Sequence, residues 1–176
     1  MYTSPIEFWS LPVKIIIHSF KMREVNNPYK GLDGYLCFGC CPDNAFGLRL
    51  KFVENGEFIE SEWEPSAYFQ GYKNILHGGI QASLLDEIAG WTVSVKLGSS
   101  GVTSHLDIRY KKPVRVDEGN LKLKARVIKQ EKRIATVEAE LLNSKGISCA
   151  SAVIEYYVLP EEKAKKEFYY PGKEKF

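Results

Sequence analysis

The sequence predicts an α+β fold in which an antiparallel sheet wraps around one long central helix. The helix is predicted by the run from Gly78 to Lys96, which has no proline and only one glycine after its first two residues. The sheet is predicted by about six segments in which apolar and polar residues alternate. A single apolar helix among several strands buries its surface best when the strands surround it.

Apolar residues cover a wide arc of the predicted helix, roughly 220° when successive residues are placed 100° apart. Such a helix is mostly buried. Asp86 falls at the margin of this arc, beside the small residues Ser83 and Gly90. Glu87 points about 100° away, toward the more polar side of the helix, so we expect the two acids to have different roles.

The strands are predicted from alternation and from the turns between them. Leu48, Leu50 and Phe52 alternate with basic residues, and Asn55-Gly56 then marks a hairpin turn. The other predicted strands are residues 58–63, 102–110, 121–128, 134–142 and 147–158. On the last of these, Ala150 and Ala152 share a face and are small enough to let the helix sit close.

Length and composition favour one domain without a nucleic-acid or membrane partner. The chain has 176 residues and a net charge of +2, from 24 basic and 22 acidic residues. The apolar segment 11–20 is interrupted by Lys14 and is too short to span a bilayer. Four cysteines in an ordinary composition do not make a disulfide framework, so a reducing cytoplasm is the expected location.

Three of the cysteines, Cys37, Cys40 and Cys41, are crowded together. A structural zinc site needs four ligands, usually as paired Cys/His groups, and the remaining candidates are isolated. A redox pair is expected at a helix start in a βαβ unit, which is not predicted here. We therefore expect a metal-free structural loop, and no cofactor. The other residues that could bind zinc are each isolated in the sequence: His18, His77, His105 and Cys149.

The predicted helix opens on Gly78 and Gly79, which follow His77. Because glycine has no Cβ, a ligand can approach the main chain closely at this point. The first backbone N–H groups of a helix have no partner within it, and the positive end of the helix dipole lies there. This end suits a carbonyl oxygen that is becoming an oxyanion.

Three segments resemble one family. Residues 77–87, HGGIQASLLDE, resemble the active-site helix of the hotdog-fold acyl-CoA thioesterases of the phenylacetate-pathway (PaaI-like) branch, in which an acid follows the histidine by nine residues. Residues 37–50 resemble the Cys-Phe-Gly-Cys-Gly-x-x-Asn-x-x-Gly-Leu segment of that branch, with Cys41 in place of the usual glycine. Residues 102–114 are similar to the strand that follows the helix in the family.

The resemblance implies hydrolysis of an acyl-CoA to a carboxylic acid and free CoA. It gives Asp86 the role of general base or nucleophile and the Gly78 N–H that of oxyanion donor. His77 is expected to fix the loop, and the hydroxyl of Thr103 to assist the acid or the water. The candidate substrate-binding residues are Gly79, Asn74, Lys111 and Lys112, and the candidate acyl-pocket residues are Leu84, Ile88, Tyr68 and Phe69.

Two other functions remain open at this point. A hotdog dehydratase or hydratase pairs a catalytic histidine with an acid, and a non-catalytic acyl-CoA-binding protein uses the fold without chemistry. The expected domain organisation is an N-terminal extension (1–25), the hotdog domain (26–160) and a charged C-terminal tail (161–176), solvated or loosely docked.

Helix geometry predicts the oligomeric state. Gly78 and Asp86 are eight residues apart, which separates them by about 12 Å along one helix axis. Both cannot therefore reach one thioester within a single chain. An antiparallel two-fold partner would place its Asp86 opposite this Gly78. We expect an obligate homodimer with composite sites, which could pair further into a tetramer.

Overall fold

The computed structural model describes residues 22–176 and contains one sheet and one long helix. The predictions made for residues 1–21, including those for His18 and the apolar segment 11–20, lie outside the described residues. The elements are β1 (Arg23–Val25), β2 (Phe52–Asn55), β3 (Phe58–Trp63), η1 (Ala67–Phe69), α1 (Gly78–Leu97), β4 (Gly101–Tyr110), β5 (Leu121–Glu131), β6 (Ile134–Leu142), β7 (Ser148–Val158), α2 (Glu161–Phe168) and η2 (Lys173–Lys175).

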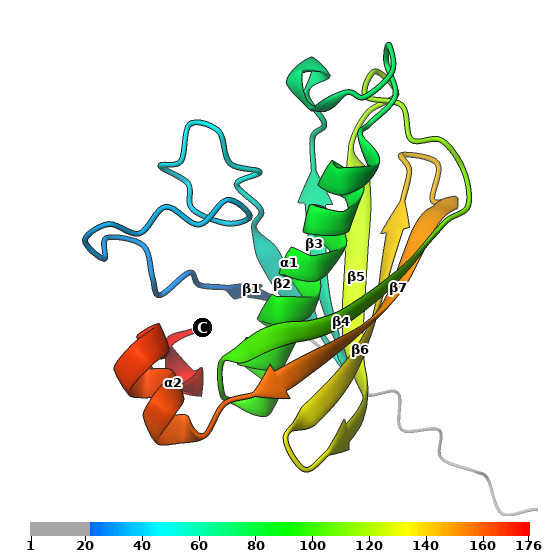
Figure 1. Cartoon of the computed structure of the whole chain (residues 1–176). Helices are drawn as coiled ribbons and strands as arrows, with labels where there is room; N and C mark the ends of the chain where they lie inside the picture. Colours follow the sequence, from blue (N-terminus) through cyan, green and yellow to red (C-terminus); the bar gives the residue numbers. More distant parts are fainter. Residues whose placement is uncertain (1–21) are drawn as a thin grey trace, which may run out of the picture.

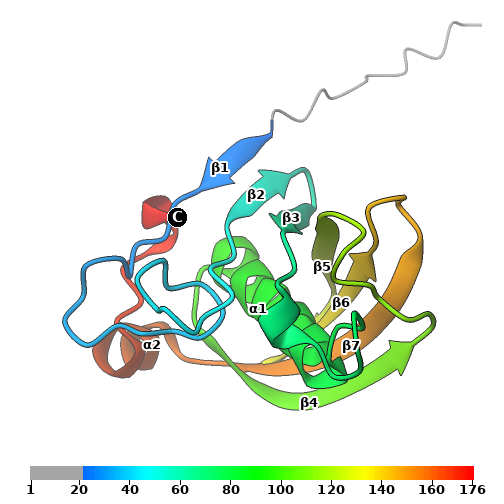
Figure 2. The same cartoon turned by 90° about the horizontal axis from the view of Figure 1, so that it is seen from above.

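The seven strands form one antiparallel sheet in the order β1-β2-β3-β5-β6-β7-β4. The sheet curves around α1, which runs through its concave side (Figures 1 and 2). This confirms the α+β architecture with a central helix. None of the helices in residues 22–176 combines the length and apolarity that crossing a membrane requires.

A row of alanines lets α1 approach the middle of the sheet. Ala125 on β5 pairs in register with Ala139 on β6, which pairs in turn with Ala152 on β7. All three are buried. α1 contacts β5, β6 and β7, and its residues Leu84 and Ile88 have no exposed surface.

The first predicted strand differs from the structure. Residues 48–51 are not a strand, and β2 begins only at Phe52. Arg49 adopts a left-handed φ of 57°, which breaks the extended backbone. The amides of Leu48 and Leu50 instead donate to the carbonyls of Phe38 and Gly39, at 2.7 and 2.9 Å. The alternation therefore reflects a segment that anchors the cysteine loop.

Both ends of the described chain join the core more closely than the sequence suggests. β1 pairs with β2, so the sheet begins within the segment assigned to the extension. In the tail, α2 and the residues after it bury Ala164, Tyr170 and Phe176. The Phe176 ring meets the Trp91 ring edge-on, with centroids 5.5 Å apart. The expectation of a solvated or loosely docked tail is therefore wrong, because Tyr170 and Phe176 pack against α1.

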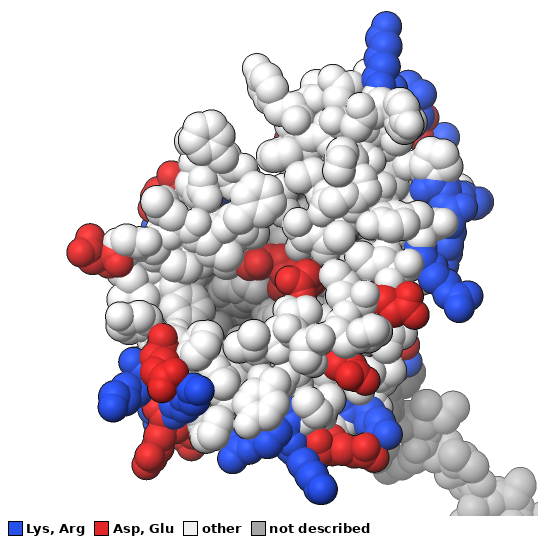
Figure 3. All heavy atoms as spheres, viewed as in Figure 1, with Lys and Arg blue, Asp and Glu red and all other residues white. Residues whose placement is uncertain are grey.

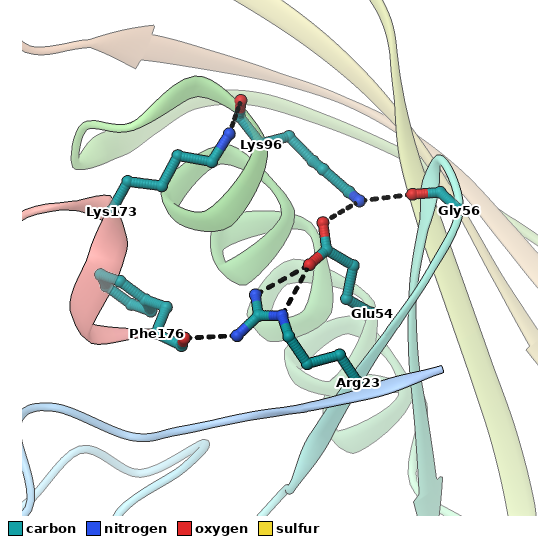
Figure 4. A network of polar contacts seen from close by, with 6 residues as sticks. All are labelled: Arg23, Glu54, Gly56, Lys96, Lys173 and Phe176. Atoms are coloured by element: carbon teal, nitrogen blue, oxygen red, sulfur yellow. Dashed lines mark hydrogen bonds and ion pairs between the residues drawn. The ribbon is translucent and has the colours of Figure 1, made fainter. Parts of the chain in front are cut away.

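A polar network holds these ends together (Figure 4). Glu54 on β2 accepts hydrogen bonds from Arg23 on β1 and from the Lys96 ammonium on α1. Arg23 also donates to the carbonyl of Phe176, and Lys173 donates to the carbonyl of Lys96. Burial tends to raise the pKa of the Glu54 carboxyl, but its two cations together hold that pKa below its usual value.

Candidate active site

The first turn of α1 is fixed by His77. This residue caps the helix, and its Nδ1 accepts a hydrogen bond from the Gly79 N–H at 2.9 Å. A Cβ on Gly79 would stand only 3.1 Å from that nitrogen, so a side chain here would push the ring outward by a few tenths of an ångström. The Tyr110 hydroxyl donates to the Gly78 carbonyl at 2.9 Å. As the first helical residue, Gly78 has no acceptor for its N–H within the helix.

A cavity of about 480 Å³ opens at this end of the helix. His77 and Gly78 line it, together with Lys111 and Lys112 at the end of β4. The structure thus brings four of the predicted site residues together. Asn74 and Gly79 do not line this cavity. The Asn74 amide instead donates to the Asp117 carboxylate at 2.9 Å.

Asp86 lies two turns further along α1, where two hydroxyl groups hold its carboxylate. Thr103 Oγ1 on β4 donates to Asp86 Oδ1 at 2.8 Å, and Tyr156 Oη on β7 lies 2.7 Å from the same oxygen. Tyr156 Oη is also 2.7 Å from the Asp86 carbonyl. Burial, followed by the negative charge of Asp86, raises the pKa of Tyr156, so its hydroxyl stays protonated and available as a donor.

Sequence reasoning missed Tyr156 as a site residue. The alternation along β7 correctly places it on the inward face with Ala152 and Ile154, where a large side chain is normally interpreted as part of the hydrophobic core. A buried tyrosine hydroxyl needs a polar partner, however, and that was the available signal. Thr103 and Tyr156 are direct partners in the β4–β7 pairing, so both hydroxyls converge on one carboxylate.

Glu87 is expected on the more polar side of the helix, and the structure gives it polar partners that differ from those of Asp86. Glu87 Oε1 accepts a hydrogen bond from Trp91 Nε1 at 3.0 Å, and the Cys37 thiol lies 3.6 Å from the same oxygen. What the sequence does not predict is that the long loop 26–51 lies against this side of α1, as Figure 2 shows. Periodicity within the helix carries no information about a loop that packs against it from a distant part of the chain.

Burial raises the pKa of the Glu87 carboxyl to about 7, with the nearby Cys37 as the next cause. A hydrogen bond from the Cys40 thiol lowers the pKa of Cys37 to about 5, and backbone amides of the loop act in the same direction. The pKa of Cys40 is raised, first by that same bond to Cys37 and then by burial. The three groups therefore share negative charge in a small volume.

A cavity of about 870 Å³ lies between α1, the loop 26–51 and the C-terminal tail. Asp86 and Glu87 both line it, and Figure 3 shows it as a hollow with acidic side chains at its edge. Of the expected acyl-pocket residues, none lines this cavity: Leu84 and Ile88 are fully buried, and Tyr68 is 96% exposed. Its other lining residues include Leu36, Gly90, Ser94, Phe168 and Tyr169.

Within one chain, the two halves of the predicted machinery stay apart. His77 and Gly78 line the smaller cavity, whereas Asp86 and Thr103 line the larger one, and the two cavities share no lining residue. This separation agrees with the distance that helix geometry requires.

Comparisons with known proteins place the chain in a family. The model of the thioesterase superfamily matches residues 73–150. A candidate esterase of Saccharolobus solfataricus is 30% identical over 119 residues, which cover 67% of this chain and 77% of that protein. A Bacillus halodurans protein, solved with CoA, is 31% identical with a TM-score of 0.53, over 57% of this chain and 66% of its own.

Two less similar structures share the fold. A thioesterase superfamily protein has a TM-score of 0.61 and 23% identity, over 76% of this chain but only 60% of its own length. The PaaI protein of the Escherichia coli phenylacetic acid degradation operon has a TM-score of 0.58 and 20% identity, over 65% and 82% of the two chains. The resemblance carried by the three sequence segments is thus confirmed, and the chain belongs to the thioesterase superfamily.

Proposed function

We propose that the protein hydrolyses the thioester bond of an acyl-CoA, with Asp86 as the general base. The observation that carries this proposal is the Asp86 carboxylate on the wall of the larger cavity, held at one oxygen by the hydroxyls of Thr103 and Tyr156. Both donors bind Oδ1, which leaves Oδ2 to accept a proton from water.

In the proposed step, Asp86 takes a proton from a water molecule while the water oxygen attacks the thioester carbonyl carbon. The carbonyl oxygen becomes an oxyanion, which the N–H of Gly78 at a helix start would stabilise. The carbonyl group then re-forms as the carbon–sulfur bond breaks, and the CoA thiolate leaves with the proton that Asp86 took from water, so that the carboxylic acid is released and Asp86 is again a carboxylate. The two hydroxyls keep the carboxylate oriented throughout.

A homodimer would supply the missing half of each site. β4 is an edge strand of ten residues, and within the described chain only β7 pairs with it. It exposes Val102, Leu106 and Tyr110, although a long apolar edge is a liability in a monomer. Pairing of two β4 strands about a two-fold axis would cover this edge. It would also bring the Gly78 of one chain toward the Asp86 of the other.

The CoA moiety would bind near the N-terminus of α1. Lys111 and Lys112 line the same cavity as Gly78, and an ammonium group suits a phosphate. Both lysines are exposed, and the Lys111 ammonium lies 2.9 Å from Ser148 Oγ and 3.9 Å from Glu140 Oε1. The CoA bound in the Bacillus halodurans relative supports a ligand of this class.

The test is a hydrolysis screen over aliphatic and aromatic acyl-CoAs that measures the release of free CoA thiol. We expect turnover by the wild-type protein and loss of turnover in Asp86→Asn. Binding without thiol release from any substrate would support a non-catalytic acyl-CoA-binding protein, and addition of water to an enoyl-CoA without thiol release would support a hydratase. Either result would overturn the proposal.

A second experiment tests the composite site. Inactive Asp86→Asn subunits are mixed with inactive subunits in which Gly78 is replaced by Leu, and the chains are allowed to exchange. Mixed dimers should regain one working site of two, because one interface combines the intact Gly78 of one chain with the intact Asp86 of the other. No recovery despite proven exchange, or a fully active monomer, would rule out the shared site.

A further inference from the structure

We propose that Cys37, Cys40 and Glu87 form a binding site for a thiophilic divalent metal ion such as Zn²⁺, separate from the machinery assigned above. The two thiol sulfurs and a carboxylate oxygen all lie within 4.8 Å of one another. Cys37 Sγ is 3.6 and 3.8 Å from the two Glu87 oxygens. A sulfur and an oxygen on one tetrahedral zinc ion lie about 3.6 Å apart, given bonds of about 2.3 and 2.1 Å.

The expectation of a metal-free loop rested on counting cysteines and histidines alone. It overlooked Glu87, which is 50 residues from Cys37 in sequence and reaches the cysteines only through the packing of loop 26–51 on α1. Two thiolates and one carboxylate match the ligand preferences of zinc better than those of calcium or magnesium, which favour oxygen alone.

Gly39 lies between the two cysteines in sequence, and the Glu87 carboxylate occupies the space where a side chain of residue 39 would be. A Cβ at this position would lie 2.1 Å from Glu87 Cδ and 2.2 Å from Glu87 Oε2, far inside contact distance. The φ of Gly39 is not in the left-handed region, so what sets this glycine apart is space: a Cβ here would displace the Glu87 carboxylate from its present position. The loop therefore admits the carboxylate between the two thiols.

Outer contacts orient the ligands, as they do around established metal sites. Trp91 Nε1 donates to Glu87 Oε1 at 3.0 Å, and the Tyr35 hydroxyl lies 2.9 Å from Cys40 Sγ. The side-chain amide of Asn27 donates to the Cys40 carbonyl at 3.1 Å, which fixes the loop. Trp91 thus contacts Glu87, whereas Tyr35 and Asn27 both contact Cys40.

The remaining coordination position would face the larger cavity. All three ligand residues line that cavity, as do Asp86 and Gly90 on α1. Three protein ligands and one open position are the pattern of zinc sites that bind water or a small ligand. The proposed ion would thus present an exchangeable position to whatever molecule fills the cavity.

A reversible disulfide between Cys37 and Cys40 is the main alternative. It would explain why two thiols are adjacent, but not why a carboxylate is packed between them in the space left by Gly39. A metal ion explains all three groups. The experiment therefore uses the full chain kept reduced by a phosphine, so that metal binding and disulfide formation give different results.

The test is titration of metal-free, reduced protein with Co²⁺ and then Zn²⁺. We expect one equivalent of Co²⁺ per chain, with thiolate-to-cobalt charge-transfer absorption and the visible bands of a tetrahedral ion, and displacement by Zn²⁺. Absence of stoichiometric binding, or binding without the charge-transfer bands, would overturn the proposal. So would protein that contains the Cys37–Cys40 disulfide on isolation and binds no cobalt after full reduction.

Variants assign the ligands. Cys37→Ser and Cys40→Ser should abolish the charge-transfer absorption, and Glu87→Gln should weaken binding by at least about tenfold. Cys41→Ser is the matched control, because the Cys41 thiol donates to the Tyr35 carbonyl and lies outside the cluster. An unchanged affinity in Glu87→Gln, or equal loss in Cys41→Ser, would contradict the assignment. Circular dichroism checks that each variant is folded. If a cysteine variant does not fold, Glu87→Gln alone tests the site.

Discussion

Asp86 and Glu87 are adjacent on one helix and line one cavity, yet their surroundings differ in kind. Asp86 faces the sheet, where β4 and β7 each supply a hydroxyl. Glu87 faces the loop 26–51, where it meets a thiol, with an indole N–H from its own helix. A rotation of about 100° between neighbours is therefore enough to place one acid among oxygen donors and the other among sulfur atoms.

The largest expected effect is on kcat, and it should differ between substitutions of these two carboxylates. Asp86→Asn keeps the shape of the side chain but removes the base, so kcat for acyl-CoA hydrolysis should fall by at least about 10²-fold. Glu87→Gln, measured on metal-free protein, should cost far less, because Glu87 does not take the proton. Steady-state kinetics of both variants with one acyl-CoA provides the measurement. Comparable losses would remove the distinction between the two acids.

Gly39→Ala should disrupt the contact between the loop 26–51 and the Glu87 carboxylate. The new methyl group would overlap the Glu87 carboxylate, so we expect a loss of stability of about 1–3 kcal/mol, typical of overpacking. Chemical denaturation measures this loss, and cobalt affinity should fall in parallel. Gly78→Ala is the matched control, because its added Cβ would lie 3.6 Å from the Tyr110 ring, at ordinary contact distance. Equal destabilisation by both substitutions would show that Gly39 has no special role.

Tyr156→Phe tests the hydrogen bonding between Asp86 and the sheet. It removes the hydroxyl that reaches both the carboxylate and the carbonyl of Asp86, without changing the ring that packs in the core. Loss of one buried hydrogen-bonded hydroxyl should cost about 1 kcal/mol of stability. A comparable loss of transition-state stabilisation would lower kcat by roughly fivefold. Thr103→Val, at a more exposed position, should have a smaller effect; a larger effect from Thr103 would reverse the order assigned here.

The smallest effect concerns a third carboxylate, Glu54, whose partners are cations. Its folded-state pKa is lowered, so its contribution to stability is present above the unfolded pKa and is lost as the pH falls through the folded pKa. Because Glu54 is partly exposed, Glu54→Gln should cost only about 0.5–1 kcal/mol near neutral pH. Urea unfolding of both proteins should show this difference shrink below about pH 4. A difference that grows in acid would contradict the assignment.

Local patterns predicted the parts of the site that lie on one element. The limits of α1, the position of Asp86 and the arrangement of His77 before Gly78 all follow from periodicity, capping and spacing within a few turns. The central helix also required a surrounding sheet, because so wide an apolar arc must be covered. The structure agrees with each of these.

Contacts that depend on register or on distant loops could not be predicted in this way. The convergence of Thr103 and Tyr156 depends on how β4 pairs with β7, and a shift by one residue would turn one side chain away. The cysteine partners of Glu87 come from a loop with little regular structure. The burial of Phe176 depends on aromatic packing between the tail and α1, which the high charge of the tail concealed.

The alanine row on β5, β6 and β7 acts as a spacer of fixed thickness beneath the helix. Because close-packed interiors transmit volume changes, one added methyl group at Ala139 would lift α1 away from the sheet. Asp86 and Glu87 travel with the helix, while Thr103, Tyr156 and the cysteine loop stay with their own elements. The small alanine side chains therefore set the distance between each of these two carboxylates and its hydrogen-bond partners.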